Sequence, residues 1–263
     1  ALMDGRGSRH FIAEIFRAMR GEPLIGSKAD FATMEFPKII LTQKPEASRV
    51  QTDWLTGAPR AGETGFEWRR LRVPTSGQNV LGRAAEALAA FMHRRTDLPA
   101  VFTIPIDLRR HLPGFVSTMN FTGQLRVPFH KGDSAQDFRE KLHRMLSARM
   151  EVYPQRGGTI LKLLPRRWID RVATRLLTSE KRPFQTAVVT NGGRTDIRTY
   201  SCSEFHLKAF FSAPFAGATM VALSSVGTQL DLVITMPKKF SSDGRLEDLM
   251  DHLEERLSDR VEE

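Results

Sequence analysis

The hydrophobic pattern of the chain switches between two periods. Apolar residues recur at helical spacing after Ser8, from Val80 to Met92, after Ser134, over 159–179 and from Leu246. Between these stripes lie short runs that alternate or are continuously apolar, as strands do. We predict strands over residues 66–73, 100–106, 115–127, 186–190, 204–212, 218–224 and 229–236. This succession predicts an α/β fold, a two-layer arrangement of helices on a mixed sheet.

One long stretch keeps neither period. Residues 22–65 are rich in Pro, Gly, Ser, Thr and Lys, and an irregular segment of this length is typical of a connection between lobes. We therefore divide the chain at Gly65. Residues 1–64 are expected to hold the end of a first lobe and the connection, and residues 65–263 a second lobe.

Composition and charge narrow the classes of partner. The longest apolar runs are too short to span a bilayer, and the single cysteine, Cys202, excludes an internal disulfide, which fits a cytoplasmic protein. The formal net charge of +9 and the pI of about 10.1 favour acidic ligands or partners. Nucleic acid is not expected among them, because aromatic residues are sparse and are not interleaved with the cations.

Several kinds of chemistry lack a sequence signal. No two of the seven histidines show the close spacing of a metal site, so no metal is expected. The chain has no G-x-S-x-G motif and no complete glycine-rich phosphate loop. A serine-nucleophile hydrolase and a nucleotide-loop enzyme are therefore not predicted.

Four short motifs follow one another along the chain: Asp4-Gly5, Asp107-Leu108-Arg109, Asn120-Phe121 and Thr190-Asn191-Gly192-Gly193. In this order they resemble the condensation-domain and chloramphenicol-acetyltransferase-like acyltransferases, which carry an HHxxxDG signature and include alcohol acyltransferases and peptide-synthetase condensation domains. Residues 214–218 depart from the DFGWG-like loop of that superfamily. Counting back from Asp4 places the signature's catalytic His one position before Ala1, so the resemblance implies a chain truncated just after that residue, made mostly of the C-terminal lobe.

The resemblance also assigns roles to individual residues. Asp4 and Gly5 are implied to be structural, with Asp4 paired to Arg109 in an ionic strut, and a guanidinium fork does match a carboxylate in two hydrogen bonds. Asn120, Asn191 and Gly192 become candidates for a substrate channel. The residues alone leave plainer alternatives open. Asp-Gly and Asn-Gly are common turns, and Arg109 can be a surface cap.

The activity that the resemblance implies is transfer of an acyl group from a coenzyme A or carrier-protein thioester to a hydroxyl or amine. The acyl-CoA or acyl-phosphopantetheine donor is a substrate, and no bound cofactor is expected. Because the general base precedes Ala1, the chain alone is expected to be inactive and to need an upstream segment as partner. The alternative is a non-catalytic basic module that binds an acidic carrier protein or a membrane surface, to which a basic amphipathic helix after Pro165 would contribute peripheral contact.

Overall fold

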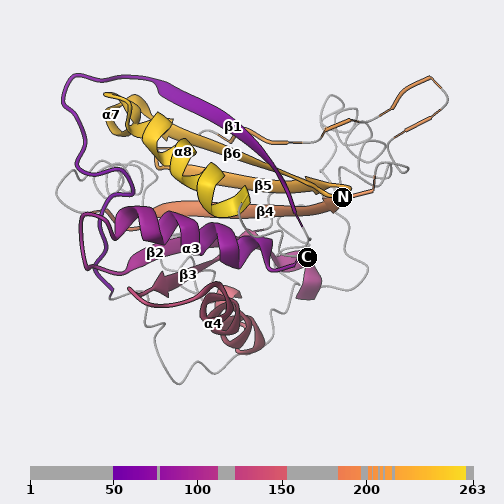
Figure 1. Cartoon of the computed structure of the whole chain (residues 1–263). Helices are drawn as coiled ribbons and strands as arrows, with labels where there is room; N and C mark the ends of the chain where they lie inside the picture. The colour runs from indigo at the N-terminus through magenta and orange to yellow at the C-terminus, as the bar shows by residue number, and fades with distance from the viewer. Residues whose placement is uncertain are drawn as a thin grey trace, which may run out of the picture.

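The computed structural model describes residues 50–75, 78–111, 122–152, 183–196, 201–202, 204–206, 208–209, 211–214 and 217–258. Six strands there form one mixed sheet in the order β1-β6-β5-β4-β2-β3, with helices against one face (Figure 1). The strands are β1 (Phe66–Pro74), β2 (Ala100–Asp107), β3 (Thr122–Phe129), β4 (Ala187–Thr195), β5 (Met220–Val226) and β6 (Gln229–Pro237). The helices are α3 (Val80–Met92), α4 (Ala135–Ser147), α7 (Lys238–Ser241) and α8 (Arg245–Ser258), with 3-10 turns η2 (Leu108–His111) and η3 (Met150–Val152). The predicted α/β class with a mixed sheet is confirmed.

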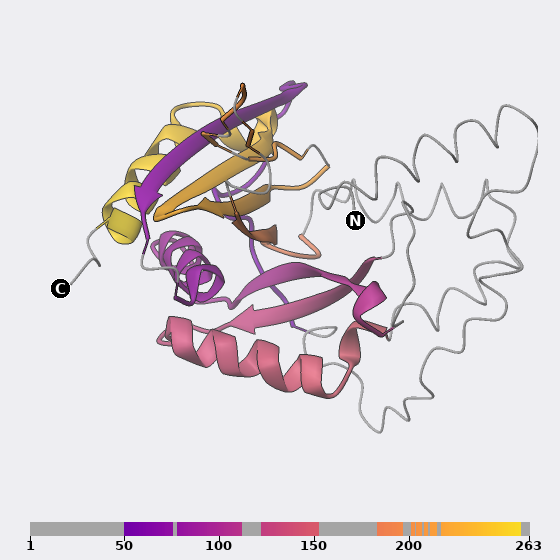
Figure 2. The same cartoon turned by 90° about the vertical axis from the view of Figure 1, so that its right-hand side faces the viewer.

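The three central strands β5, β4 and β2 are parallel, and the outer pairs are antiparallel. β4 pairs with β5 as far as Thr195, opposite Val226, with a shift of register between Asn191 and Arg194. Its pairing with β2, in contrast, consists of Phe102 with Ala187 and Thr103 with Val188. Beyond these pairs the carboxyl-terminal halves of β2 and β4 are no longer paired. Figure 2 shows the β2–β3 hairpin turned away from the other strands.

The helices cover the inner face of the sheet because their apolar stripes match its buried side chains. Helix α3 buries an alanine-rich face that includes Leu88 and Phe91, both at most 1% exposed, and α8 packs beside it. Gly82 lets α4 approach α3 closely, since a Cβ at this position would lie 2.5 Å from the Ala135 carbonyl oxygen. Helix α4 starts at the predicted cap, Ser134, which forms a capping box with Asp137.

Most predicted elements within the described residues are confirmed, and one is wrong. The expected strand over 204–212 does not form in its described residues. Phe205 and Phe211 supplied its apolar alternation, but they are 57% and 39% exposed, so the pattern does not correspond to a buried face. The helices expected after Ser8 and over 159–179 lie outside the described residues, as do residues 112–121 of the predicted strand over 115–127.

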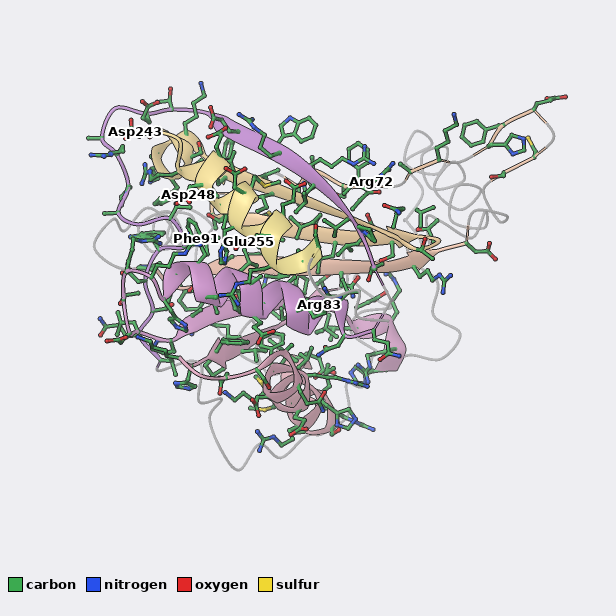
Figure 3. All side chains as sticks on the ribbon, in the orientation of Figure 1. Arg72, Arg83, Phe91, Asp243, Asp248 and Glu255 are labelled. Carbon is green, nitrogen blue, oxygen red and sulfur yellow. The ribbon has the colours of Figure 1, made fainter. Side chains whose placement is uncertain are left out.

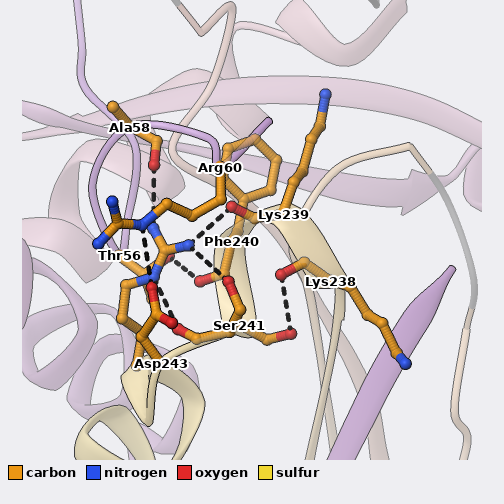
Figure 4. A network of polar contacts seen from close by, with 10 residues as sticks. Thr56, Ala58, Arg60, Lys238, Lys239, Phe240, Ser241 and Asp243 are labelled. Atoms are coloured by element: carbon orange, nitrogen blue, oxygen red, sulfur yellow. Dashed lines mark hydrogen bonds and ion pairs between the residues drawn. The ribbon is translucent and has the colours of Figure 1, made fainter. Parts of the chain in front are cut away.

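Residues 50–65 are irregular, as predicted, and contact α7 and the start of α8. Thr56 donates to the Phe240 carbonyl at 2.7 Å, and Arg245 donates to the Ala58 carbonyl at 2.9 Å (Figure 4). Arg60 pairs with Asp243 at 3.0 Å. These contacts join part of the predicted connection to α7 and α8. The division at Gly65 stays a prediction.

No helix in the described part of the chain combines the length and the apolar character needed to cross a membrane.

Candidate functional site

Two of the sequence motifs lie at the carboxyl ends of neighbouring parallel strands. Asp107-Leu108-Arg109 ends β2 and enters η2, and Asn191-Gly192-Gly193 lies in the last part of β4. β2 and β4 are parallel neighbours, so their carboxyl ends point the same way. The carboxyl end of β5 lies beside that of β4, so this end of the sheet contains chain segments that are far apart in sequence.

The Asn191 segment forms a bulge inside β4. Pairing with β5 shifts register between Asn191 and Arg194, and Gly193 has a φ of 76°, which favours glycine. The Asn191 side-chain oxygen accepts a hydrogen bond from the Gly193 backbone N–H at 2.9 Å. The strand then continues to Thr195, so Asn191-Gly192 is not the hairpin turn that the dipeptide alone could have meant.

A cavity of about 420 Å³ opens beside this bulge. Its lining comes from the start of α3, the β4 bulge and the β5–β6 turn: Thr75, Gln78, Asn79, Val80, Leu81, Asn191, Gly193, Arg194, Ser225, Gly227 and Thr228. The candidate residue Asn191 therefore lies on a concave surface. Gly192 is not part of the lining but lies in the same bulge, where an added Cβ would come 3.4 Å from the Leu223 carbonyl oxygen.

The polar side chains that line the cavity can donate hydrogen bonds, and the amides and hydroxyls among them can also accept hydrogen bonds. Arg194 is the charged residue of this lining, and amides and hydroxyls supply the other polar side chains. Because the Asn191 oxygen is held by Gly193, its amide nitrogen is the part left to donate to a ligand. No acid, histidine or cysteine is among the lining residues. The cavity as described can bind acceptor-rich or anionic groups but offers no general base.

Arg109 is held locally. Its Nη1 lies 2.8 Å from Oδ2 of Asp107, and its backbone N–H donates to Oδ1 of the same carboxylate at 3.0 Å. Leu108 between them is fully buried and anchors the turn. Asp4, Gly5 and Asn120 lie outside the described residues, so the pairing of Asp4 with Arg109 and the role of Asn120 stay predictions.

A buried pair that sequence reasoning missed fixes the same turn. His111 Nε2 lies 2.9 Å from Oε1 of Glu151, with the two side chains 9% and 0% exposed. Gly123 makes room for η3, because a Cβ there would lie 2.4 Å from the Glu151 carbonyl oxygen. The pair ties η2 to η3 and thus positions the segment that carries Arg109. Neither its spacing nor its local pattern distinguishes it in the sequence.

A second charged cluster lies on the outer face of the sheet, opposite the helices. Asp231 of β6 is fully buried and accepts hydrogen bonds from Nε of Arg70 at 2.8 Å and Nε of Arg72 at 3.0 Å. The hydrogen bond that Arg72 donates to Asp231 raises the pKa of Arg72 above its ordinary value, against a smaller opposing effect of burial. Figure 3 shows Arg72 on β1 and Arg83 on α3.

The described residues contain no cluster of three or more His, Cys, Asp or Glu side chains that could hold a metal ion.

No protein-family model and no curated protein matches the chain. Among solved structures it is similar to the nonribosomal peptide synthetase FmoA3, with 17% identity and a TM-score of 0.45, over 80% of this chain and 24% of that one. It is also similar to the wax ester synthase/diacylglycerol acyltransferase from Marinobacter aquaeolei VT8, with 15% identity and a TM-score of 0.42, over 76% and 50%. A third is a structure of condensation-domain-mediated chain release from the enacyloxin polyketide synthase, with 12% identity and a TM-score of 0.47, over 82% and 46%. The chain spans between about a quarter and a half of the length of these structures.

Proposed function

We propose that the chain is part of a condensation-type acyltransferase and that the cavity at the Asn191 bulge receives part of the thioester donor. The observation that carries this proposal is that the Asn191 motif, in the last part of the parallel strand β4, lies on the wall of a polar cavity. In open sheets, ligands bind outside the carboxyl ends of parallel strands, where neighbouring strands part. β2 and β4 part after Thr103 and Val188, with the motif segments at their ends.

The chemistry of the lining supports a donor that carries phosphate and amide groups. A coenzyme A or phosphopantetheine arm offers anionic oxygens to Arg194 and carbonyl oxygens to the Asn191 amide. The acceptor is a hydroxyl or an amine. In the step that we propose, the motif His placed before Ala1 acts as general base and takes the acceptor's proton while the acceptor attacks the thioester carbonyl. The C–S bond then breaks, the acyl group stays on the acceptor, and the departing thiolate takes the proton from the His. Asp4 and Arg109 hold the loop of that His in this proposal.

The donor site can be tested on the chain as it stands. Isothermal titration with coenzyme A should show binding that weakens at least roughly tenfold in Arg194→Ala, because a hydrogen bond to a charged group is worth about 1.5–3 kcal/mol and about 1.4 kcal/mol is a factor of ten. Asn191→Ala should weaken it less. Arg60→Ala is the matched control, because Arg60 does not line the cavity and pairs with Asp243 instead. No binding, or equal loss in Arg194→Ala and Arg60→Ala, would overturn the assignment.

The catalytic part of the proposal needs a second assay. Thioester turnover should be absent for the chain alone and should appear when a segment carrying His-His directly before Ala1 is joined to it. Changing the second of these histidines to Ala should abolish the activity again. Equal turnover with and without the segment would show that the base lies elsewhere.

A further inference from the structure

Strand β1 forms a long, regular edge of the sheet. Its nine residues pair with β6 without a register shift, from Phe66 opposite Pro237 to Pro74 opposite Gln229. It is the first strand in the sheet order, and no further strand pairs with it in the part of the chain that the structure describes (Figure 1). Backbone groups along such an edge are a template for an additional strand.

Aromatic side chains are exposed on the outer face beside this edge. Trp68 of β1 is 46% exposed, and Phe211, which lies over the same face, is 39% exposed. The guanidinium of Arg70 stacks on Phe211 at 4.1 Å from the ring centroid. Large aromatic surface at an open edge is what an added strand could cover with its own apolar side chains.

The same face presents two arginines that are already fixed in place. Arg70 and Arg72 both form ion pairs with Asp231. Asp231 is fully buried, whereas the side chains of Arg70 and Arg72 are 28% and 42% exposed. One carboxylate against two guanidinium groups leaves a net charge of about +1 at the surface. Because Asp231 holds the arginines, a bound carboxylate would not have to order them first.

We propose that β1 binds an extended acidic segment of a partner protein as an additional strand, with carboxylates opposite Arg70 and Arg72 and an apolar side chain against Trp68. The proposal does not depend on acyl transfer. Charge argues against a second copy of the chain as the occupant. Antiparallel self-pairing centred on Arg69, Arg70 or Leu71 places arginine opposite arginine, and like charges directly opposite destabilise a strand pair.

The experiment uses a fluorescein-labelled peptide of alternating Glu and Val, long enough to span β1, with fluorescence anisotropy as the readout. The acidic peptide should bind the chain, and the same peptide with Lys in place of Glu should not. Alternate backbone N-methylation blocks one edge of the peptide, so at least one of the two N-methylated versions should lose binding. Equal binding of the acidic and basic peptides, or no effect of either N-methylation, would overturn strand addition.

Two arginines of β1 give a matched pair of variants. Arg72→Gln should lower the affinity for the acidic peptide about fivefold, because a cross-strand charged pair is worth up to about 1 kcal/mol. Arg69→Gln removes the same charge from the other face, where Arg69 pairs with Glu247 at 2.7 Å, and should leave affinity within about twofold. Thermal melting checks that both variants fold. If Arg72→Gln does not fold, the proposal is still tested by comparing how the acidic, basic and N-methylated peptides bind to the unmodified chain. Equal effects of the two substitutions, or a β1-mediated dimer in analytical ultracentrifugation, would contradict the proposal.

Discussion

Asp231 tests the energetics of the outer face most directly. It is fully buried in β6, and its charge is compensated by the guanidinium groups of Arg70 and Arg72. Breaking a buried ion pair typically costs about 3–5 kcal/mol. Here the arginines are 28% and 42% exposed and can regain water, so we place Asp231→Asn at about 2–3 kcal/mol of lost unfolding free energy.

The assay is urea denaturation at neutral pH, read by circular dichroism, with Asp243→Asn as control. Asp243 is 60% exposed in its pair with Arg60, so its change should cost less than about 1 kcal/mol. Its φ of 62° is one that Asn tolerates. A double-mutant cycle of Asp231→Asn with Arg72→Met should show coupling of at least about 1 kcal/mol. Additive effects, or a loss of only about 0.5 kcal/mol in Asp231→Asn, would refute the assigned compensation.

Three further substitutions test individual buried contacts. Gly82→Ala should destabilise the chain even though Ala favours helices by about 1 kcal/mol, because the new Cβ would lie 2.5 Å from a carbonyl oxygen of α4; a stabilised variant in urea denaturation would contradict this packing. Glu151→Ala should lower the melting temperature through loss of its buried contact with His111, and unchanged melting would show that the pair does not anchor η2. Burial lowers the pKa of His252, so the folded state binds fewer protons and stability should fall as pH drops below about 6.5. His252→Gln should flatten this dependence measured by denaturation at several pH values, and an unchanged slope would assign it to other groups.

Local pattern was enough for elements whose stabilisation is local. Helix α4 begins after Ser134, as predicted, where the structure shows a capping box with Asp137, and α3 follows its alanine-rich stripe. The strand expected over 204–212 failed because alternation reports burial only where a sheet covers one face. Phe211 instead contributes its ring to Arg70 from outside the sheet.

The site was predictable only in part, because its geometry depends on pairing between distant segments. The motif pointed to Asn191, and the structure places that residue on a cavity wall. It gave no signal for Ser225 or Thr228, which reach the cavity through the order of β4, β5 and β6. Asp231 is one polar residue in a strand whose other eight are mostly apolar, and its arginine partners come from a strand some 160 positions earlier in the chain.

The cavity and the β1 surface share a structural element, and this bears on how rigid both are. Thr75 directly follows β1 and lines the cavity, and its backbone N–H donates to the Thr228 carbonyl of the β5–β6 turn at 2.9 Å. The wall opposite the bulge is therefore built from the ends of paired strands. Sites held by strands keep their geometry better than sites held by loops alone. A ligand at Asn191 thus meets a largely preformed wall, and a strand added to β1 extends the same hydrogen-bonded frame.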